Sequence, residues 1–211
     1  MAVATEHDSR TTLLDAALHV IRAKGYAATT VDNICQHAGV TKGSFFHHFK
    51  SKDELALGAV ARFGEMSQSL FARAPFQQAR DPLDRILGYI DFRGQILTGE
   101  LPDYTCLIGT LVQETYDTHP TIRVACDECF TDHVTRLARD IEAAKKRYAP
   151  RASWTPESVA YFIQGVLQGS FIFAKAQQSP EVVRQNLAHL RRYVRSLFAA
   201  ARHAMRKVPR S

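Results

Sequence analysis

The sequence lacks any stretch that could serve as a membrane span or a secretory leader. No run approaches the roughly 18 uninterrupted apolar residues that a transmembrane helix requires, and the opening MAVATEHDSR has no basic start followed by an apolar run. The four cysteines, at positions 35, 106, 126 and 129 of 211 residues, are too few and too unevenly spaced for a disulfide framework. We therefore expect a soluble, cytoplasmic protein with reduced thiols and no membrane partner.

The sequence also lacks the motifs that mark common enzymes. It contains no Gly-rich phosphate loop, no Ser/His/Asp set and no metal-ligand spacing. His47 and His48 are adjacent, and neighbouring positions on a helix diverge by about 100°, so the two rings do not easily chelate one ion. A catalytic Cys106 would need a nearby base, for which His119 and His133 are unsupported candidates. We expect no enzyme, no cofactor and no metal, and keep a thiol-dependent enzyme as an alternative.

What the sequence does contain is helical periodicity along nearly its whole length. Apolar residues recur at three- and four-residue spacing, and no run alternates with period two, so we predict an all-α fold of about nine helices. The first helix uses Leu13, Leu14, Ala17, Leu18 and Ile21 as its apolar face and stops at Gly25. Ser51 and Glu54 form a capping box that begins a fourth helix running towards Pro75. Later helices are expected at 82–98, 103–117, 121–147, 156–177 and 181–206.

A short segment between these first and fourth helices carries the main functional signal. TTVD, residues 29–32, is typical of a helix start, and Gly39 is suited to end that helix in the left-handed conformation. Thr41 then caps a third short helix that runs through Phe49. Two short helices joined by a turn that contains Gly form a helix-turn-helix, whose second helix enters the DNA major groove.

Basic charge is concentrated in two places. Lys42, Lys50 and Lys52 occur without an acidic residue in the run 39–52, a pattern that suits either a nucleic-acid footprint or a solvated face. Residues 184–211 carry eight Lys or Arg and no Asp or Glu, so this segment could itself bind DNA. Because Leu187, Leu190, Val194 and Leu197 recur there at helical spacing, we favour a packed helix with Arg191, Arg192 and Arg195 on its solvated side.

The segment TTVDNICQHAGVTKGSFFHHFKSKDEL, residues 29–55, closely resembles the DNA-binding signature of the tetracycline-repressor (TetR/AcrR) family of bacterial transcriptional regulators. The resemblance implies a three-helix DNA-binding domain over residues 1–55 and a larger helical domain for effector binding and dimerisation over residues 56–211. Family members bind palindromic double-stranded operators as homodimers, and repression released by an effector is their common outcome. Activation, or an effector-independent DNA-binding scaffold, remains an alternative.

Individual roles follow from the resemblance, position by position. Residues expected to contact DNA phosphates are Thr30, Lys42, His48 and Lys52, and residues expected to face the groove are Thr41, Gly43, Ser44, Phe45 and His47. The family most often has Tyr where this sequence has Phe46, so the phosphate contact of that phenol is absent. Cys35 stands where the family usually has Ala, and we read it as a small buried residue.

The larger domain offers candidates for dimerisation and for effector binding. Gly165 and Gly169 lie four residues apart, a spacing that allows close approach of a second backbone and is also common in ordinary cores. Candidate residues for an effector pocket are Phe92, Ile96, Cys106, Leu107, Leu111, Phe130, Trp154 and Phe162, all of which could equally be plain core.

Cys106 carries a second hypothesis, a thiol sensor. It lies in the first turn of the helix expected at 103–117, where the positive helix end favours a thiolate. Lys175 is isolated among uncharged residues and could be its charge partner, and some TetR-family members sense oxidants or electrophiles through a cysteine. An inert buried Cys106 and a solvated Lys175 are the competing interpretation. Cys126 and Cys129 are expected in the core, with a transient disulfide as a minor alternative.

Overall fold

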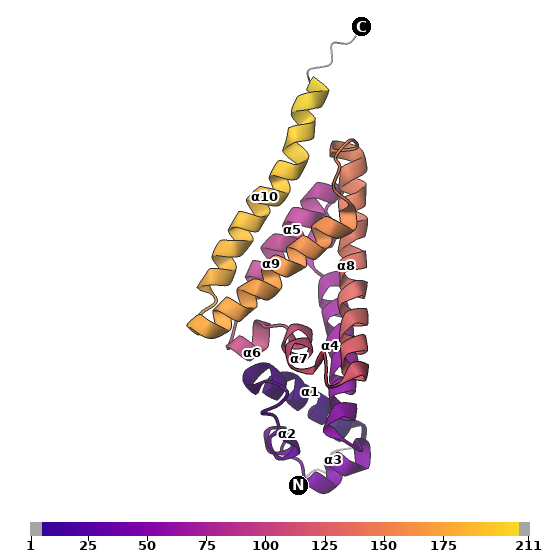
Figure 1. Cartoon of the computed structure of the whole chain (residues 1–211), viewed down its shortest axis with the longest axis vertical. Helices are drawn as coiled ribbons and strands as arrows, with labels where there is room; N and C mark the ends of the chain where they lie inside the picture. The colour runs from indigo at the N-terminus through magenta and orange to yellow at the C-terminus, as the bar shows by residue number, and fades with distance from the viewer. Residues whose placement is uncertain (1–5, 207–211) are drawn as a thin grey trace. The chain divides into compact units, whose positions relative to one another are not determined.

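The computed structural model describes the backbone of residues 6–206 and the side chains of residues 9–199. The first five residues and the end of the basic segment, residues 207–211, lie outside that range. The described residues form α-helices, one short 3-10 helix and connecting loops, in agreement with the all-α prediction (Figure 1). None of these described helices is long and apolar enough to cross a membrane.

The helices divide between two packed units. The first unit comprises the chain up to Ser69 together with Glu100–Phe130, and the second comprises Leu70–Gly99 together with residues from Thr131 onward. Two long helices, α4 (Lys52–Ala72) and α8 (Pro120–Tyr148), contribute to both. These units are defined by packing, and the expected division into a DNA-binding domain over residues 1–55 and a larger domain over residues 56–211 remains a prediction.

The first unit is built around the N-terminal three helices. Besides α4 and the beginning of α8, its helices are α1 (Glu6–Lys24), α2 (Val31–Ala38), α3 (Lys42–His48), α6 (Leu101–Tyr104) and α7 (Leu107–Thr115). The predicted apolar face of α1 is buried throughout, and Gly25 ends the helix at a φ of 85°. These residues share one core with Phe45, Leu55 and Leu107.

Residues 101–115 differ from the prediction, because they form two helices instead of one. Thr105 is extended, and its hydroxyl donates to the carbonyl of Leu101 at 2.7 Å. Arg22 of α1 donates to the carbonyls of Asp103 and Thr105, at 3.3 Å each, which satisfies the end of α6 from outside the helix. With this break, the described residues contain ten α-helices. Cys106 lies immediately before α7, as its N-cap.

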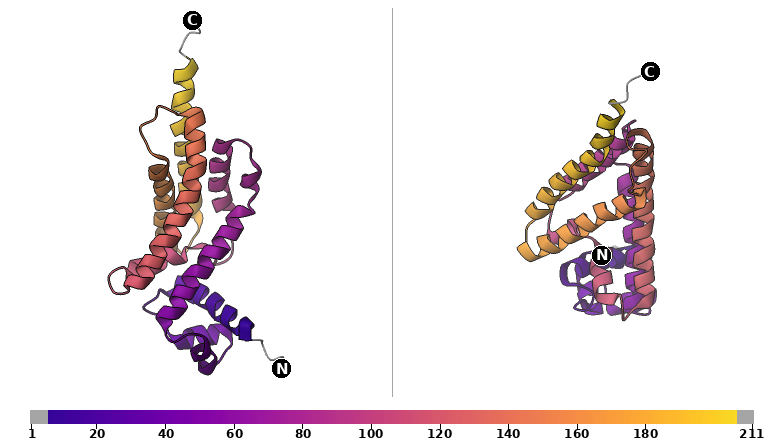
Figure 2. Two further views of the ribbon diagram at one scale, coloured as in Figure 1. Left: turned by 90° about the vertical axis from the view of Figure 1, so that its right-hand side faces the viewer. Right: turned by 45° about the horizontal axis from the view of Figure 1, so that its top comes forward.

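The second unit contains the end of α4, the 3-10 helix at Pro75–Gln78, α5 (Pro82–Gln95), the remainder of α8, α9 (Pro156–Gln177) and α10 (Glu181–Arg206). The bounds of α9 and α10 are those that periodicity predicted. These two helices form an antiparallel pair connected by a short turn (Figures 1 and 2). Leu187, Leu190 and Val194 are buried while Arg192 and Arg195 are exposed, so the basic segment is a packed helix within the described residues.

Candidate nucleic-acid interface

The turn between α2 and α3 is held by backbone hydrogen bonds. Gly39 adopts a φ of 66°, and its amide donates to the carbonyl of Gln36 at 3.3 Å. The Val40 amide donates to the carbonyl of Cys35 at 3.0 Å, which completes a Schellman motif. A Cβ on Gly39 would have no atom within 4 Å, so the positive φ, rather than crowding, is what favours glycine here.

Side-chain caps fix the start of each helix in this pair. Thr30 and Asn33 form a reciprocal capping box at α2. At α3 the Thr41 hydroxyl accepts from the Ser44 amide at 3.2 Å. The two caps orient α2 and α3 and leave Lys42 and Gly43, the first two residues of α3, exposed.

The structure corrects the expected roles of the two phenylalanines of α3. Phe45 is fully buried with Phe49 and the apolar residues of α1, so it cannot face a DNA groove. Phe46 is 58% exposed and packs edge-to-face on Phe45. Adjacent residues on a helix point about 100° apart. Packing of α3 on the core of the first unit therefore decides which of the two phenylalanines faces outward. Phe46 is therefore the aromatic residue that the recognition helix presents.

Basic and imidazole side chains surround α3, and they differ in exposure and in the partners that they contact. Lys42 is exposed and lies 2.7 Å from Asp32 of α2, and this hydrogen-bonded carboxylate raises the pKa of the lysine. Lys52 donates to the carbonyls of Tyr26 and Thr29 and lies over the Tyr26 ring, so it also holds the loop before α2. His48 lies 2.7 Å from the Ser9 hydroxyl, and His47 is exposed.

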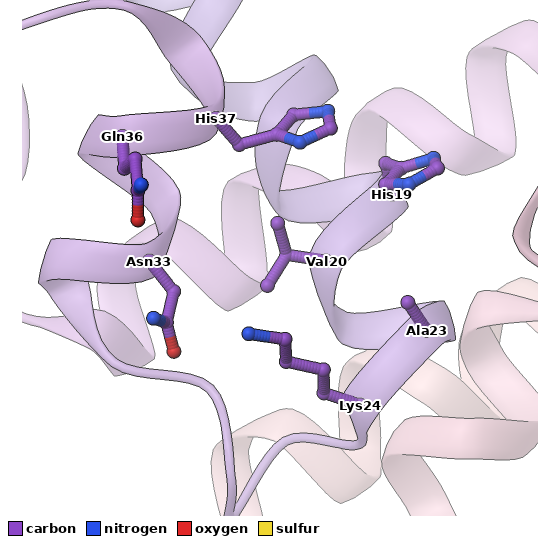
Figure 3. Close-up of a pocket in the computed structure, with 7 residues that line it drawn as sticks. All are labelled: His19, Val20, Ala23, Lys24, Asn33, Gln36 and His37. Carbon is purple, nitrogen blue, oxygen red and sulfur yellow. The ribbon is translucent and has the colours of Figure 1, made fainter.

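A polar surface pocket of about 490 Å³ lies between α1 and α2 (Figure 3). It is lined by His19, Val20, Ala23, Lys24, Asn33, Gln36 and His37. The rings of His19 and His37 stack with centroids 4.6 Å apart. Small-molecule sites are usually lined mainly by apolar side chains, whereas only Val20 and Ala23 are apolar here, so we do not assign the effector site to this pocket.

The residues expected to line one effector pocket fall into two units. Leu107 and Leu111 are fully buried in the core of the first unit, so they are core residues and not a pocket wall. Cys106 and Phe130 are partly buried against the same core. The others belong to the second unit: Phe92 and Ile96 on α5 or its end, Trp154 against Phe198, Phe162 against Tyr193, and Lys175 on α9.

Three polar side chains of the second unit come together without having been predicted as a site, although His133 was considered as a base for Cys106. The Tyr89 hydroxyl lies 2.9 Å from Nε2 of His133 and accepts a hydrogen bond from Gln164 at 2.8 Å. These residues come from α5, α8 and α9, and their separations of 31 to 75 positions leave no local sequence pattern. Burial, followed by the charges of Arg93 and Arg136, lowers the pKa of His133 to about 4.

The fold and the exposed recognition helix define a DNA-binding transcriptional regulator, and the chain matches two protein-family models of such regulators. The family model described as "Bacterial regulatory proteins, tetR family" matches residues 13–59, and the model described as "Tetracyclin repressor-like, C-terminal domain" matches residues 82–206. The chain belongs to the tetR family of bacterial regulatory proteins.

Individual relatives extend over nearly the whole chain. The HTH-type transcriptional repressor NemR of Escherichia coli K12 is 24% identical over 193 residues, which cover 90% of this chain and 96% of NemR. A crystal structure of E. coli NemR in the reduced form has a TM-score of 0.72 at 23% identity, covering 87% of this chain and 95% of that one. The regulatory protein TetR from Rhodobacter sphaeroides has a TM-score of 0.78 at 23% identity, covering 87% and 97%. At this identity the solved structures support the fold alone.

Proposed function

We propose that this protein is a repressor that binds a palindromic operator as a homodimer and leaves it when an effector binds or when Cys106 is modified. The observation that carries the DNA-binding part is the exposed N-terminal end of α3, where Thr41, Lys42 and Gly43 follow a tightly hydrogen-bonded turn. Helix-turn-helix proteins contact base edges with this end of the recognition helix. A bacterial operator lies in the cytoplasm, which is the compartment the proposal implies.

The contacts divide into two kinds. Lys42, His48, Lys52 and Thr30 are proposed to position the protein on phosphates, and Thr41, Gly43, Ser44 and His47 to face the groove. We add Phe46 in place of Phe45, because an exposed phenyl ring can contact a thymine methyl group. Lys52 uses two of its three ammonium donors within the protein, so one remains for a phosphate.

The outward side of α9 supports the dimer. Its exposed apolar residues include Phe162, Ile172 and Phe173, which are 45 to 56% exposed. A Cβ on Gly165 or Gly169 would meet nothing within 4 Å, so neither glycine is crowded by another part of the described chain. Exposed apolar surface of this extent on one helix marks an interaction site, and a two-fold axis there would match a palindromic operator.

The surroundings of Cys106 support the thiol branch of the proposal. Its sulfur accepts from the Gly109 amide at 3.5 Å, at the N-terminal end of α7. Arg22 of α1, which donates to the carbonyl of Thr105, brings a fixed positive charge beside the thiol. Glu114 at the other end of α7 accepts from the Ala27 amide, just before α2, at 2.8 Å. A change at α7 can therefore reach the DNA-binding helices through contacts within one unit. The pairing of Cys106 with Lys175 remains a prediction.

Footprinting on the DNA upstream of the protein's own gene tests the proposal. We expect protection of two half-sites related by a two-fold axis, about one helical turn apart. Protection should be lost when a small-molecule pool or a mild oxidant is added. A protein that protects no specific sequence in this region or in a genomic library of fragments would contradict the repressor proposal.

A further inference from the structure

Aromatic rings from several helices of the second unit form a cluster. Phe71, at the end of α4, has its ring centroid 5.4 Å from that of Tyr89, 5.9 Å from Phe92 and 5.1 Å from His133. Phe76 contacts Tyr89 and Phe92 at 5.8 Å each. Because Phe71, Phe76 and Phe92 each keep some exposure, the cluster is not a sealed core.

Arg93 lies in this cluster, with its guanidinium group over two of the rings. Its guanidinium carbon is 5.4 Å from the Phe71 centroid and 5.7 Å from the Phe171 centroid. Among the described residues, no carboxylate pairs with Arg93, and the nearby Asp91 is bound to Arg191 at 2.7 Å. No buried side-chain nitrogen or oxygen in the described chain lacks a hydrogen-bond partner. The unbonded N–H groups of the half-buried Arg93 therefore reach accessible space.

The adjacent polar residues add a neutral donor. Gln164 donates to the Tyr89 oxygen, and the Tyr89 hydroxyl lies 2.9 Å from Nε2 of His133. We take the Tyr89 hydroxyl as the donor of this second bond, which puts the ring proton of a neutral His133 on Nδ1. Since His133 titrates near pH 4, it is neutral at pH 7 and can donate one hydrogen bond without adding a second full charge.

We propose that Arg93, the aromatic rings around it and His133 form a binding site for a small aromatic carboxylate, which acts as the effector. This inference rests on the proposed function as an effector-controlled regulator. A guanidinium binds a carboxylate through two parallel hydrogen bonds. Phenyl rings pack on a planar apolar body in offset or edge-to-face arrangements. The charge of Arg93, which no described carboxylate pairs, disfavours a cationic ligand. An aromatic acid would supply a carboxylate to Arg93 and a planar ring to the partly exposed Phe71, Phe76 and Phe92.

Calorimetric titration of the full-length protein tests the site. The probes are benzoate and 1-naphthoate, with benzamide as an uncharged isostere of benzoate and cyclohexanecarboxylate as an acid without an aromatic ring. We expect the two aromatic acids to bind and both comparison compounds to bind more weakly. Arg93→Gln should weaken benzoate binding roughly tenfold to a hundredfold, because charge-assisted hydrogen bonds are lost. Arg136→Gln is the matched control, since it removes a charge near His133 that is already paired with Asp132 at 3.3 Å.

Circular dichroism and thermal unfolding check that each variant is folded. Arg93→Lys keeps the charge but not the planar guanidinium group, so we expect an intermediate loss of benzoate affinity. The site is refuted if neither aromatic acid binds, if benzamide or cyclohexanecarboxylate binds as well as benzoate, or if Arg93→Gln and Arg136→Gln behave alike. Operator binding is measured in parallel. Arg93→Gln should retain it and lose only its release by benzoate, whereas a wild-type protein without specific DNA binding would contradict the regulator proposal independently of this site.

Discussion

The ammonium nitrogen of Lys42 lies 2.7 Å from Oδ1 of Asp32, so the first residue of the recognition helix is paired with the helix before it. Both side chains are more than half exposed, and such surface pairs contribute little to stability. In the proposed complex a DNA phosphate would compete with Asp32 for Lys42, so substitutions of these two residues test the contact.

Lys42→Ala should weaken operator binding and reduce the slope of log affinity against log salt by about one unit. The effect should be similar on specific and non-specific DNA, because a phosphate contact carries no sequence information. Asp32→Asn is the control: it frees the lysine and should bind at least as tightly as the parent protein. An unchanged salt slope in Lys42→Ala would argue against a phosphate contact at this position.

Phe45 and Phe46 should respond in opposite ways to truncation. Phe45→Ala empties a fully buried position and should lower the free energy of unfolding by about 3 to 5 kcal/mol. Phe46→Ala should change stability by only about 0.5 kcal/mol but weaken operator binding. Urea unfolding and gel-shift titration separate the two effects. Equal loss of stability in both variants would contradict the outward placement of Phe46.

Cys106→Ser should retain operator binding and lose its release by mild peroxide or an electrophile. Cys126→Ala is the matched control, since burial raises the pKa of the Cys126 thiol to about 12 and leaves almost no thiolate at neutral pH. Gel shifts with and without oxidant compare the three proteins. If Cys106→Ser is released as readily as the parent, Cys106 is not the sensor.

The acid stability of the protein should depend on His133. Its pKa is lowered from 6.5 to about 4 on folding, so the unfolded chain binds a proton that the folded chain does not between these values. The contribution of His133 to the free energy of unfolding is therefore complete above about pH 6.5. It falls by at most about 3 kcal/mol as the pH decreases towards 4. His133→Gln should flatten this part of the profile in urea unfolding, whereas the exposed His189→Gln should leave it unchanged.

Charge on the outward face of α9 should separate the subunits. Ile172→Asp combined with Phe173→Asp introduces two carboxylates where both native side chains are more than half exposed, so folding of the single chain should be retained. Sedimentation at micromolar concentration should show a monomer, with loss of operator binding. Tyr116→Asp, at an exposed position of the first unit, should remain dimeric.

Local physical chemistry explains what could be read from the sequence. The turn at Gly39, the cap at Thr41 and the bounds of α9 and α10 depend on residues within a few positions of each other, and periodicity identifies such elements directly. The resemblance of residues 29–55 added the family, because the helix-turn-helix fixes residue types at many closely spaced positions.

Long-range packing decided the rest. Which of Phe45 and Phe46 is outward depends on where α1 lies, and the break before α7 depends on Arg22 capping α6 from more than 80 positions away. Tyr89, His133 and Gln164 meet only because three helices converge. Arg93 has no carboxylate partner among the described residues, because the nearby Asp91 binds Arg191. The sequence by itself determined a helical DNA-binding regulator, while tertiary contacts decided which side chains are available to DNA and to an effector.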